Sequence, residues 1–387
     1  MSSSALFIAL AFLIVLSPAF SKITRLPIVV VEILLGSIAV WFGFLDPNND
    51  VFKYLSKIGF FYLMFLAGLE INLKNFAAQR GKLLGSAILY FITLYSLSIG
   101  IYILFDLNPV YIVIIPIVSL GMIMALINEY GKKFKWLEIV LIVGVIGEII
   151  SISAIVIYES FIHNGLGFEL VKNIFIFFVV LFLIYHSFKL LNILFWWFPE
   201  LRTLIMPEDD SKVESVRISA ALFIVLISIM SILHIDMVLG AFFAGIYIAN
   251  FFEHKKDLPH TLHKVGFGFL VPIFFIYVGT TMDLNIIFSA EILSHALLIL
   301  AALVFVRVVS SYLAYSSHLN PTETFLLALG DSMPLTFIIA IATIAYEAAL
   351  ISKNEYLSLI VAGMLSGIII MSLLKFLIAY LYEKKAE

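Results

Sequence analysis

Apolar runs of about 20 residues recur along nearly the whole chain and are separated by short polar breaks. In a helix, a run of this length spans the hydrocarbon core of a bilayer, which is about 30 Å thick. The composition agrees with this interpretation, because 63% of the 387 residues are hydrophobic and only 13% are charged. Helices also satisfy their own backbone hydrogen bonds in lipid. The sequence therefore predicts an all-α polytopic membrane protein.

The polar residues, prolines and glycines between these runs predict about 13 transmembrane helices. In chain order the predicted spans are 5–20, 27–44, 54–72, 83–105, 109–129, 136–159, 170–197, 216–233, 236–252, 264–282, 290–315, 321–346 and 355–381. No basic residues precede the first run, unlike in a cleaved signal peptide. That run is therefore expected to remain as the first helix.

The lysines and arginines between the spans orient the predicted helices. With the N-terminus outside, the outer side carries four lysines, whereas almost all the other basic residues fall on the opposite side. The four are Lys53, Lys57, Lys172 and Lys353. Because basic loops stay cytoplasmic, the N-terminus is predicted outside and the C-terminus in the cytoplasm. The absence of cysteine and of N-x-S/T sequons fits a cell inner membrane.

Several short patterns recur about 210 residues apart, which indicates an internal repeat. The recurring pairs are Gly36 with Gly245, Gly68 with Gly279, and Asn108-Pro109 with Asn320-Pro321. The spacing corresponds to an odd number of spans, so the two copies are predicted to have inverted topology. Within a single transmembrane domain, 1–387, repeat one covers about 1–160, a linker helix about 170–197 and repeat two about 215–382.

The fifth and twelfth spans carry residues that weaken a helix near their middle. They are Pro116, Ser119 and Gly121 in "IIPIVSLGMIM", and Gly330, Asp331, Ser332 and Pro334 in "LALGDSMPLTF". Proline removes a backbone donor and glycine weakens the helix, so two broken helices are predicted, crossing at an ion site. In the second, Asp331 or Ser332 is expected to cap the following half-helix. Two simple kinks are the alternative.

One glutamate, Glu148, stands in the apolar run "LIVGVIGEIISIS". Counted along the helices from the cytoplasmic ends, Glu148 lies about 20 Å deep, and Arg307, Asp331 and Gly121 about 15 Å deep. A charge at such depth costs ~3 kcal/mol or more and therefore faces a partner or an aqueous cavity. These features predict one site. Glu148 could instead be a buried carboxylate that only locks the helices together.

The chain resembles the monovalent cation:proton antiporters, and among them the cation:proton antiporter-2 family. The segments that carry the resemblance are "LPIVVVEILLG", "IGFFYLMFLAGLEINL", "LGAFFAGIYIAN", "VPIFFIYVGTTMDL" and the interrupted twelfth span. In that family an acidic residue of the sixth helix binds proton and cation in competition, and the matching pair here is Gly147-Glu148. The matching basic residue of helix 11 is Arg307. The resemblance also implies a homodimer.

Three residues depart from the family pattern. Glu148 stands where aspartate is usual, Gly147 removes a polar neighbour, and Asp331 stands where many relatives have a basic or neutral residue. Because these departures lie at the predicted site, the choice of ion stays open between Na+ and K+.

The residues themselves support the same chemistry. When protonated, Glu148 is neutral; when ionised, it could hold Na+ or K+ with oxygens of Ser151, Ser119, Asp331 and freed carbonyls, while Arg307 serves as its charge partner. Because proton and cation exclude one another, alternating access would give exchange. We therefore expect a proton/monovalent-cation antiporter rather than an enzyme, with no cofactor and no nucleic-acid partner.

Other classes remain open. A gated potassium efflux system of channel-like type would need a pore lined by carbonyls or charges. A sodium-coupled organic solute carrier could share the inverted architecture. An intramembrane aspartyl protease is disfavoured, because Ala328 replaces the first glycine of its Gly-x-Gly-Asp motif and no second mid-span aspartate is present.

Overall fold

The computed structural model of the chain describes residues 3–70, 82–131, 133–164, 212–233, 237–252, 257–282 and 289–383, together with Lys255 and isolated residues between 168 and 198. Every described secondary-structure element is a helix. The predicted linker helix, about 170–197, lies largely outside the described residues.

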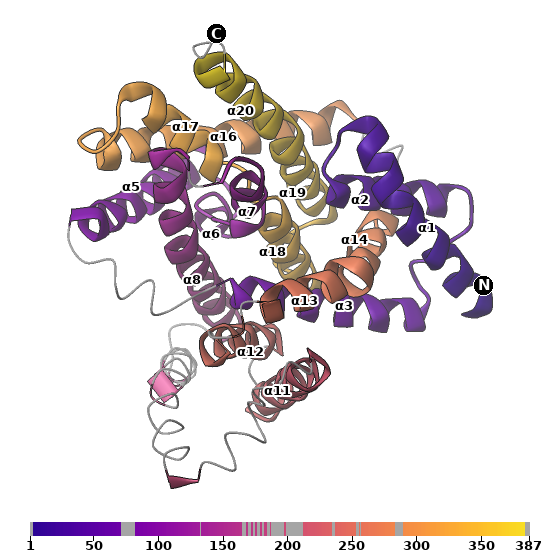
Figure 1. The fold of residues 1–387 in the computed structure, drawn as a ribbon. Coiled ribbons are helices and arrows are strands. Elements are labelled where there is room, and N and C mark those ends of the chain that lie inside the picture. The colour runs from indigo at the N-terminus through magenta and orange to yellow at the C-terminus, as the bar shows by residue number, and fades with distance from the viewer. Residues whose placement is uncertain are drawn as a thin grey trace. The chain divides into compact units, whose positions relative to one another are not determined.

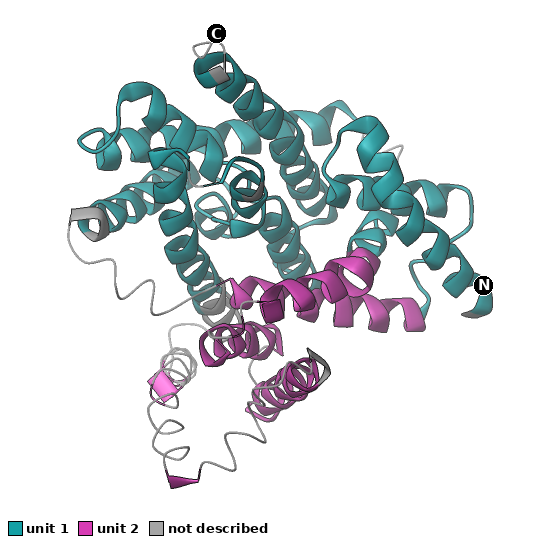
Figure 2. Cartoon of the chain, viewed as in Figure 1, with its two compact units in different colours: residues 1–49, 78–158, 275–387 teal, residues 50–77, 159–274 magenta. Residues whose placement is uncertain are grey.

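The chain divides into two compact units, coloured separately in Figure 2. Unit 1 comprises residues 1–49, 78–158 and 275–387, and unit 2 comprises residues 50–77 and 159–274. Each unit combines segments from the first and second halves of the sequence. The elements are labelled in Figure 1.

The helices of unit 1 are α1 (Ser3–Thr24), α2 (Ile28–Trp41), α5 (Lys82–Phe105), α6 (Tyr111–Ile114), α7 (Leu120–Tyr130), α8 (Lys135–Asn164, whose last residues belong to unit 2), α16 (Ala290–Tyr315), α17 (Pro321–Asp331), α18 (Leu335–Glu347), α19 (Lys353–Leu365), η2 (Ser366–Ile370), α20 (Met371–Ile378) and η3 (Ala379–Glu383). Those of unit 2 are α3 (Asp50–Leu69), α11 (Lys212–Ile232), α12 (Met237–Phe251), α13 (Asp257–Val265), η1 (Gly266–Leu270) and the start of α14 (Val271–Thr280).

Eight described helices are long and apolar enough to cross a membrane, or nine when α17 and α18 are counted as one bent span. Two shorter apolar helices, α2 and α12, accompany them. Each predicted span other than 170–197 coincides with one helix or with consecutive helical segments. The protein is therefore a multi-pass membrane protein, while the total of about 13 spans stays a prediction.

Two spans of unit 1 are interrupted where the sequence predicted. The first interruption is residues 115–119, between α6 and α7, and it contains Pro116. The second is residues 332–334, where α17 and α18 bend by 40°. Upstream, α17 begins with a capping box in which Asn320 and Glu323 bond to each other's backbone N–H, and with Pro321 in its first turn.

The predicted cap of α18 is wrong. Asp331 is the last residue of α17, Ser332 follows as its C-cap, and Pro334 directly precedes α18 without a side-chain cap. The hydroxyl of Ser332 donates to the carbonyl of Ala328 at 2.6 Å, so it serves the end of α17 instead of the start of α18. A serine in a helix often bonds back to the carbonyl four residues earlier.

The four glycines that marked the internal repeat mediate two close helix contacts. A Cβ at either glycine of a contact would overlap a backbone carbonyl of the opposite helix, so only glycine permits the approach. In unit 1, Gly36 of α2 meets Ile276 and Gly279 of α14 meets Ile33. In unit 2, Gly68 of α3 meets Phe242 and Gly245 of α12 meets Phe65. The inverted repeat itself stays a prediction.

Candidate ion-binding site

Glu148 lies in α8 with 1% of its surface exposed. Its Oε1 accepts a hydrogen bond from the backbone N–H of Leu120 at a donor–acceptor distance of 3.4 Å. Leu120 is the first residue of α7. The first N–H groups of a helix lack intrahelical partners and carry partial positive charge. The start of α7 therefore stabilises a negative charge on Glu148.

The residue preceding Glu148 brings α8 close to the first interruption. A Cβ at Gly147 would lie 2.5 Å from the Cβ of Val118, and one at Gly144 would lie 2.6 Å from Cδ2 of Leu120. A larger side chain at either position would push the two segments apart. Gly147, which departs from the family pattern, is therefore explained by packing.

Hydroxyl groups surround the same stretch of backbone. Ser151, one helical turn beyond Glu148, accepts a hydrogen bond from the N–H of Val118 at 3.1 Å. The hydroxyls of Ser119 and Thr336 lie 3.1 Å apart, and Thr336 is in the first turn of α18. In Figure 1, α6 and α7 lie between α8 and α18. Oxygens from three segments of unit 1 thus meet beside the first interruption.

Arg307 of α16 is fully buried, with 0% of its surface exposed. Its Nε donates to the backbone carbonyl of Asp331 at 2.9 Å. One terminal nitrogen donates to the carbonyls of Ile115, at 2.9 Å, and Leu303, at 3.0 Å, and the other to that of Ile117. One guanidinium thus binds the open carbonyls of the first interruption and the last carbonyl of α17.

Asp331 is the carboxylate that forms an ion pair with Arg307. Its Oδ2 lies 3.5 Å from the Nε of Arg307, and both side chains are buried. The same Oδ2 accepts a hydrogen bond from the hydroxyl of Tyr90, a fully buried residue of α5. The Oδ1 has no hydrogen-bond partner among the described residues. A buried guanidinium, carboxylate and phenol thus form one connected group.

The first interruption therefore has two electrically different ends. The guanidinium of Arg307 binds its carbonyls, at Ile115 and Ile117, and the carboxylate of Glu148 lies at the N–H of Leu120. Each charge lies beside backbone dipoles of the opposite sign. A buried carboxylate next to a stretch of backbone that carries hydroxyl and carbonyl oxygens can carry a proton or hold a small monovalent cation.

The structure places most predicted site residues around this backbone. Glu148, Ser151 and Ser119 adjoin the start of α7, and Arg307 and Asp331 adjoin the carbonyls. The predicted helix-breaking positions lie within or next to the interruptions: Pro116 in the first, Gly121 at the second residue of α7, Gly330 next to the end of α17, and Pro334 just before α18.

Sequence reasoning missed two side chains, Tyr90 and Thr336. Tyr90 belongs to an apolar span rich in aromatic residues, and Thr336 is one of many hydroxyl residues in the spans. Neither carries a charge that would mark it.

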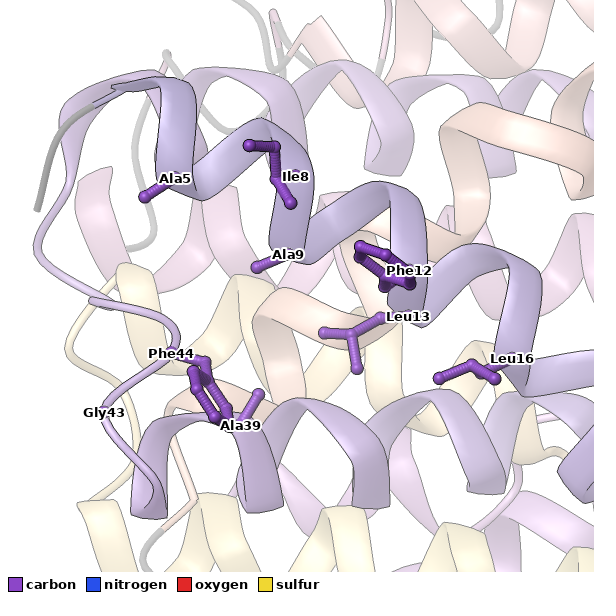
Figure 3. Close-up of a pocket in the computed structure, with 9 residues that line it drawn as sticks. All are labelled: Ala5, Ile8, Ala9, Phe12, Leu13, Leu16, Ala39, Gly43 and Phe44. Atoms are coloured by element: carbon purple, nitrogen blue, oxygen red, sulfur yellow. The ribbon is translucent and has the colours of Figure 1, made fainter.

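A separate groove in unit 1 has different chemistry. It encloses about 560 Å³ and is formed by α1, the end of α2 and the turn after α2 (Figure 3). The residues that line it have no polar side chain; they are Ala5, Ile8, Ala9, Phe12, Leu13, Leu16, Ala39, Gly43 and Phe44. An ion requires oxygen ligands, so this groove offers no cation site.

Interrupted spans that meet around a buried acid and a buried guanidinium define an ion-transporter type of site. The family model for the transmembrane sodium/hydrogen exchanger matches residues 8–379. The chain therefore belongs to the sodium/hydrogen exchanger family.

Named relatives agree with this family. The chain is 27% identical over 369 residues to a putative Na+/H+ antiporter, YjbQ, of Bacillus subtilis, with 89% of this chain covered, and it spans 58% of that relative's length. It is 24% identical to probable Na+/H+ antiporter 3 of Methanocaldococcus jannaschii, covering 88% of this chain and 87% of the relative.

A solved structure shows the same fold. The chain superposes on the sodium proton antiporter MjNhaP1 of Methanocaldococcus jannaschii with a TM-score of 0.63. The sequence identity is 16%, and 97% of each chain is covered. The likeness places the helices of this chain in the fold of a known antiporter.

Proposed function

We propose that this chain exchanges protons for Na+ or K+ across a membrane. Glu148 binds the proton and the cation in competition. The observation that carries the proposal is the burial of this carboxylate, 1% exposed, at the N–H of Leu120 where α7 begins. The names of the relatives and the family match support the same activity.

Competition follows from the charge of a single group. A deprotonated Glu148 supplies the negative charge that compensates a partly dehydrated cation, and the oxygens of Ser119 and Ser151 lie on the same stretch of backbone. A protonated Glu148 has no net charge to offer. Each carboxyl group therefore carries either one proton or one cation, which couples the two fluxes in opposite directions.

Asp331 has a different role in this proposal. Its charge is balanced by Arg307 at 3.5 Å. Asp331 can contribute to proton or cation binding only when that pair rearranges. Arg307 acts on Glu148 at a distance, as a positive charge fixed on the carbonyls of the first interruption.

The setting of the proposed function is a cell inner membrane, with the N-terminus outside and the C-terminus in the cytoplasm. The asymmetry of basic residues supports this orientation. Alternating access by two inverted repeats would expose Glu148 to each side in turn. A homodimer is the proposed assembly.

The test is a flux measurement in proteoliposomes that carry a pH-sensitive dye and an imposed proton gradient. Addition of Na+ or K+ to the wild-type protein is expected to dissipate the gradient, with a saturable dependence on the cation. Glu148→Gln removes the titrating group with little change in volume and is expected to abolish the response. The assay contains no organic solute. It is run both without and with an imposed membrane potential.

The results separate the competing classes. Cation-driven proton flux that survives in Glu148→Gln would overturn the role of Glu148. Movement of K+ without proton movement would instead indicate a gated efflux system. A requirement for an organic solute would indicate a sodium-coupled carrier. As a matched control, Glu138→Gln alters a carboxylate in the first turn of the same helix and is expected to leave exchange intact.

A further inference from the structure

The hydroxyl of Tyr90 makes a contact that the transport chemistry described above does not use. Tyr90 is fully buried in α5, and its hydroxyl donates to Oδ2 of Asp331. Burial of a phenol hydroxyl is costly unless it finds a partner, and this partner is charged. The next tyrosine along the same helix, Tyr95, has a buried hydroxyl with no hydrogen-bond partner among the residues that the structure describes. The hydroxyls of the two tyrosines thus differ in whether they make a hydrogen bond.

Tyr90 and Arg307 approach the same oxygen of Asp331. The Nε of Arg307 lies 3.5 Å from Oδ2, while Oδ1 has no hydrogen-bond partner among the described residues. A guanidinium next to an unrestrained carboxylate prefers two parallel hydrogen bonds, one to each oxygen. Here Arg307 makes a single long contact with the carboxylate and directs most of its N–H groups to backbone carbonyls. The phenol of Tyr90 holds Asp331 in an orientation that leaves most N–H groups of Arg307 available to the backbone carbonyls.

We propose that Tyr90 is a positioning residue for cation exchange: by holding Asp331, it keeps the guanidinium of Arg307 on the carbonyls of Ile115 and Ile117. This inference rests on the proposed function, because it assigns Tyr90 a role in that exchange. Without the phenol hydroxyl, the carboxylate of Asp331 is free to turn and pair with Arg307 through both oxygens. The guanidinium then leaves one or both carbonyls of the first interruption.

Displacement of the guanidinium affects the surroundings of Glu148 through three consecutive residues. Arg307 binds the carbonyl of Ile117, the N–H of Val118 binds Ser151, and Ser119 bonds to Thr336. Leu120, which contacts Glu148, follows directly. A shift of the guanidinium therefore moves the backbone that carries the oxygens around the carboxylate. Cation binding weakens, while the acid itself remains in place.

The experiment compares Tyr90→Phe with Tyr95→Phe in proteoliposomes with a pH-sensitive dye. Each variant removes one hydroxyl from the same helix. In Tyr90→Phe, the Na+ concentration for half-maximal exchange is expected to rise about tenfold, with a smaller change in maximal rate. In Tyr95→Phe it is expected to stay at the wild-type value. Equal half-maximal concentrations in the two variants would overturn the proposal.

A double-mutant cycle shows whether Tyr90 acts through Asp331. Tyr90→Phe is measured again in the Asp331→Asn background, where the carboxylate is absent. If Tyr90 acts through the carboxylate, the second substitution has little further effect on the half-maximal Na+ concentration. Equal effects of Tyr90→Phe in the two backgrounds would contradict the proposal and leave Tyr90 as a packing residue.

Fluorinated tyrosine at position 90 covers the case in which Tyr90→Phe does not fold. This side chain keeps its shape and its hydroxyl but becomes a more acidic donor, so the half-maximal Na+ concentration is expected to change while the amount of folded protein does not. No change in a folded, active protein would overturn the proposal. Failure of the wild-type protein to exchange any cation would overturn the proposed function itself, which distinguishes the two results.

Discussion

The two interruptions of unit 1 use the same guanidinium but hold their carboxylates differently. At the second interruption, Asp331 belongs to the broken span itself; its charge is balanced by Arg307, and its Oδ2 accepts a hydrogen bond from the hydroxyl of Tyr90. At the first, the carboxylate comes from another helix: Glu148 of α8 lies at the N–H of Leu120. One acid is part of an ion pair, and the other faces the dipoles at a helix start.

Because of this difference, the two carboxylates are suited to different roles. A carboxylate paired with a buried guanidinium is costly to separate from it, so Asp331 suits a fixed counter-ion. A carboxylate stabilised by backbone dipoles can exchange one positive partner for another while the backbone stays in place. Glu148 is therefore suited to bind the transported proton or cation. Substitutions can act on both interruptions, on the first alone, or on the contact between them.

Arg307→Ala acts on both interruptions and is expected to have the largest effect. It leaves carbonyls at Ile115, Ile117 and Asp331 without a donor and removes the partner of a buried carboxylate. Removing one member of a buried ion pair costs about 3–5 kcal/mol. Thermal unfolding of the purified protein in detergent is expected to shift strongly to lower temperature.

The control for Arg307→Ala is Lys375→Ala. Lys375 forms an ion pair with Glu129, but the side chains are 42% and 45% exposed. Exposed pairs contribute about 0–1 kcal/mol, so little change in unfolding temperature is expected. Similar shifts for the two variants would show that Arg307 does not join the two interruptions.

Gly147→Ala acts on the first interruption alone. Its new Cβ would lie 2.5 Å from that of Val118, so α8 and the interruption must separate. Overpacking of this kind costs about 1–3 kcal/mol. Exchange is expected to fall and to recover in part when Val118→Ala is added. Gly100→Ala is the control and is expected to retain exchange, because no described heavy atom beyond the glycine's own neighbours and helix backbone lies within 4 Å of the new Cβ.

Partial rescue distinguishes crowding from other causes. If Val118→Ala fails to restore any exchange to Gly147→Ala, the loss does not arise from contact with Val118. Gly147 would then act through another property, such as the flexibility of α8.

Thr336→Val acts on the contact between the interruptions and is expected to have the smallest effect. It keeps the side-chain shape but removes the hydrogen bond of 3.1 Å to Ser119. Such a bond contributes about 0.5–1.5 kcal/mol, so a few-fold rise in the half-maximal Na+ concentration is expected. Thr343→Val is the control in the same helix, because its hydroxyl bonds to the Ile339 carbonyl of α18 and its side chain to Tyr356 of α19, and neither residue belongs to an interruption. Equal effects would mean that the Ser119 contact is unimportant.

The sequence predicted the helices well because lipid imposes a simple rule. An apolar run either spans the bilayer as a helix or leaves backbone groups unsatisfied. Proline also marked the first interruption directly, since Pro116 cannot donate to the preceding turn. The start of α18 was predicted incorrectly, because Ser332 bonds back to Ala328 and not forward. The helix-capping propensity of serine does not show whether its hydroxyl bonds to the preceding helix or to the following one.

The charged residues of the site were predictable, but their pairing was not. Glu148, Arg307 and Asp331 stand out in apolar runs because each is costly there. Arg307 was predicted as the charge partner of Glu148, and that role stays a prediction; the ion pair with Asp331 depends on the relative rotation of α16 and α17, which no sequence pattern gives. Tyr90 was missed because a tyrosine in an apolar span is ordinary until its hydroxyl has a partner.

Proton release on cation binding tests the central claim most directly. Purified protein in weakly buffered detergent with a pH dye is mixed with NaCl or KCl, with choline chloride as the salt control. The wild-type protein is expected to release protons on addition of its cation, and its cation affinity should weaken as pH falls. Glu148→Gln is expected to release none. Equal proton release from Glu148→Gln and wild type would contradict competition at Glu148.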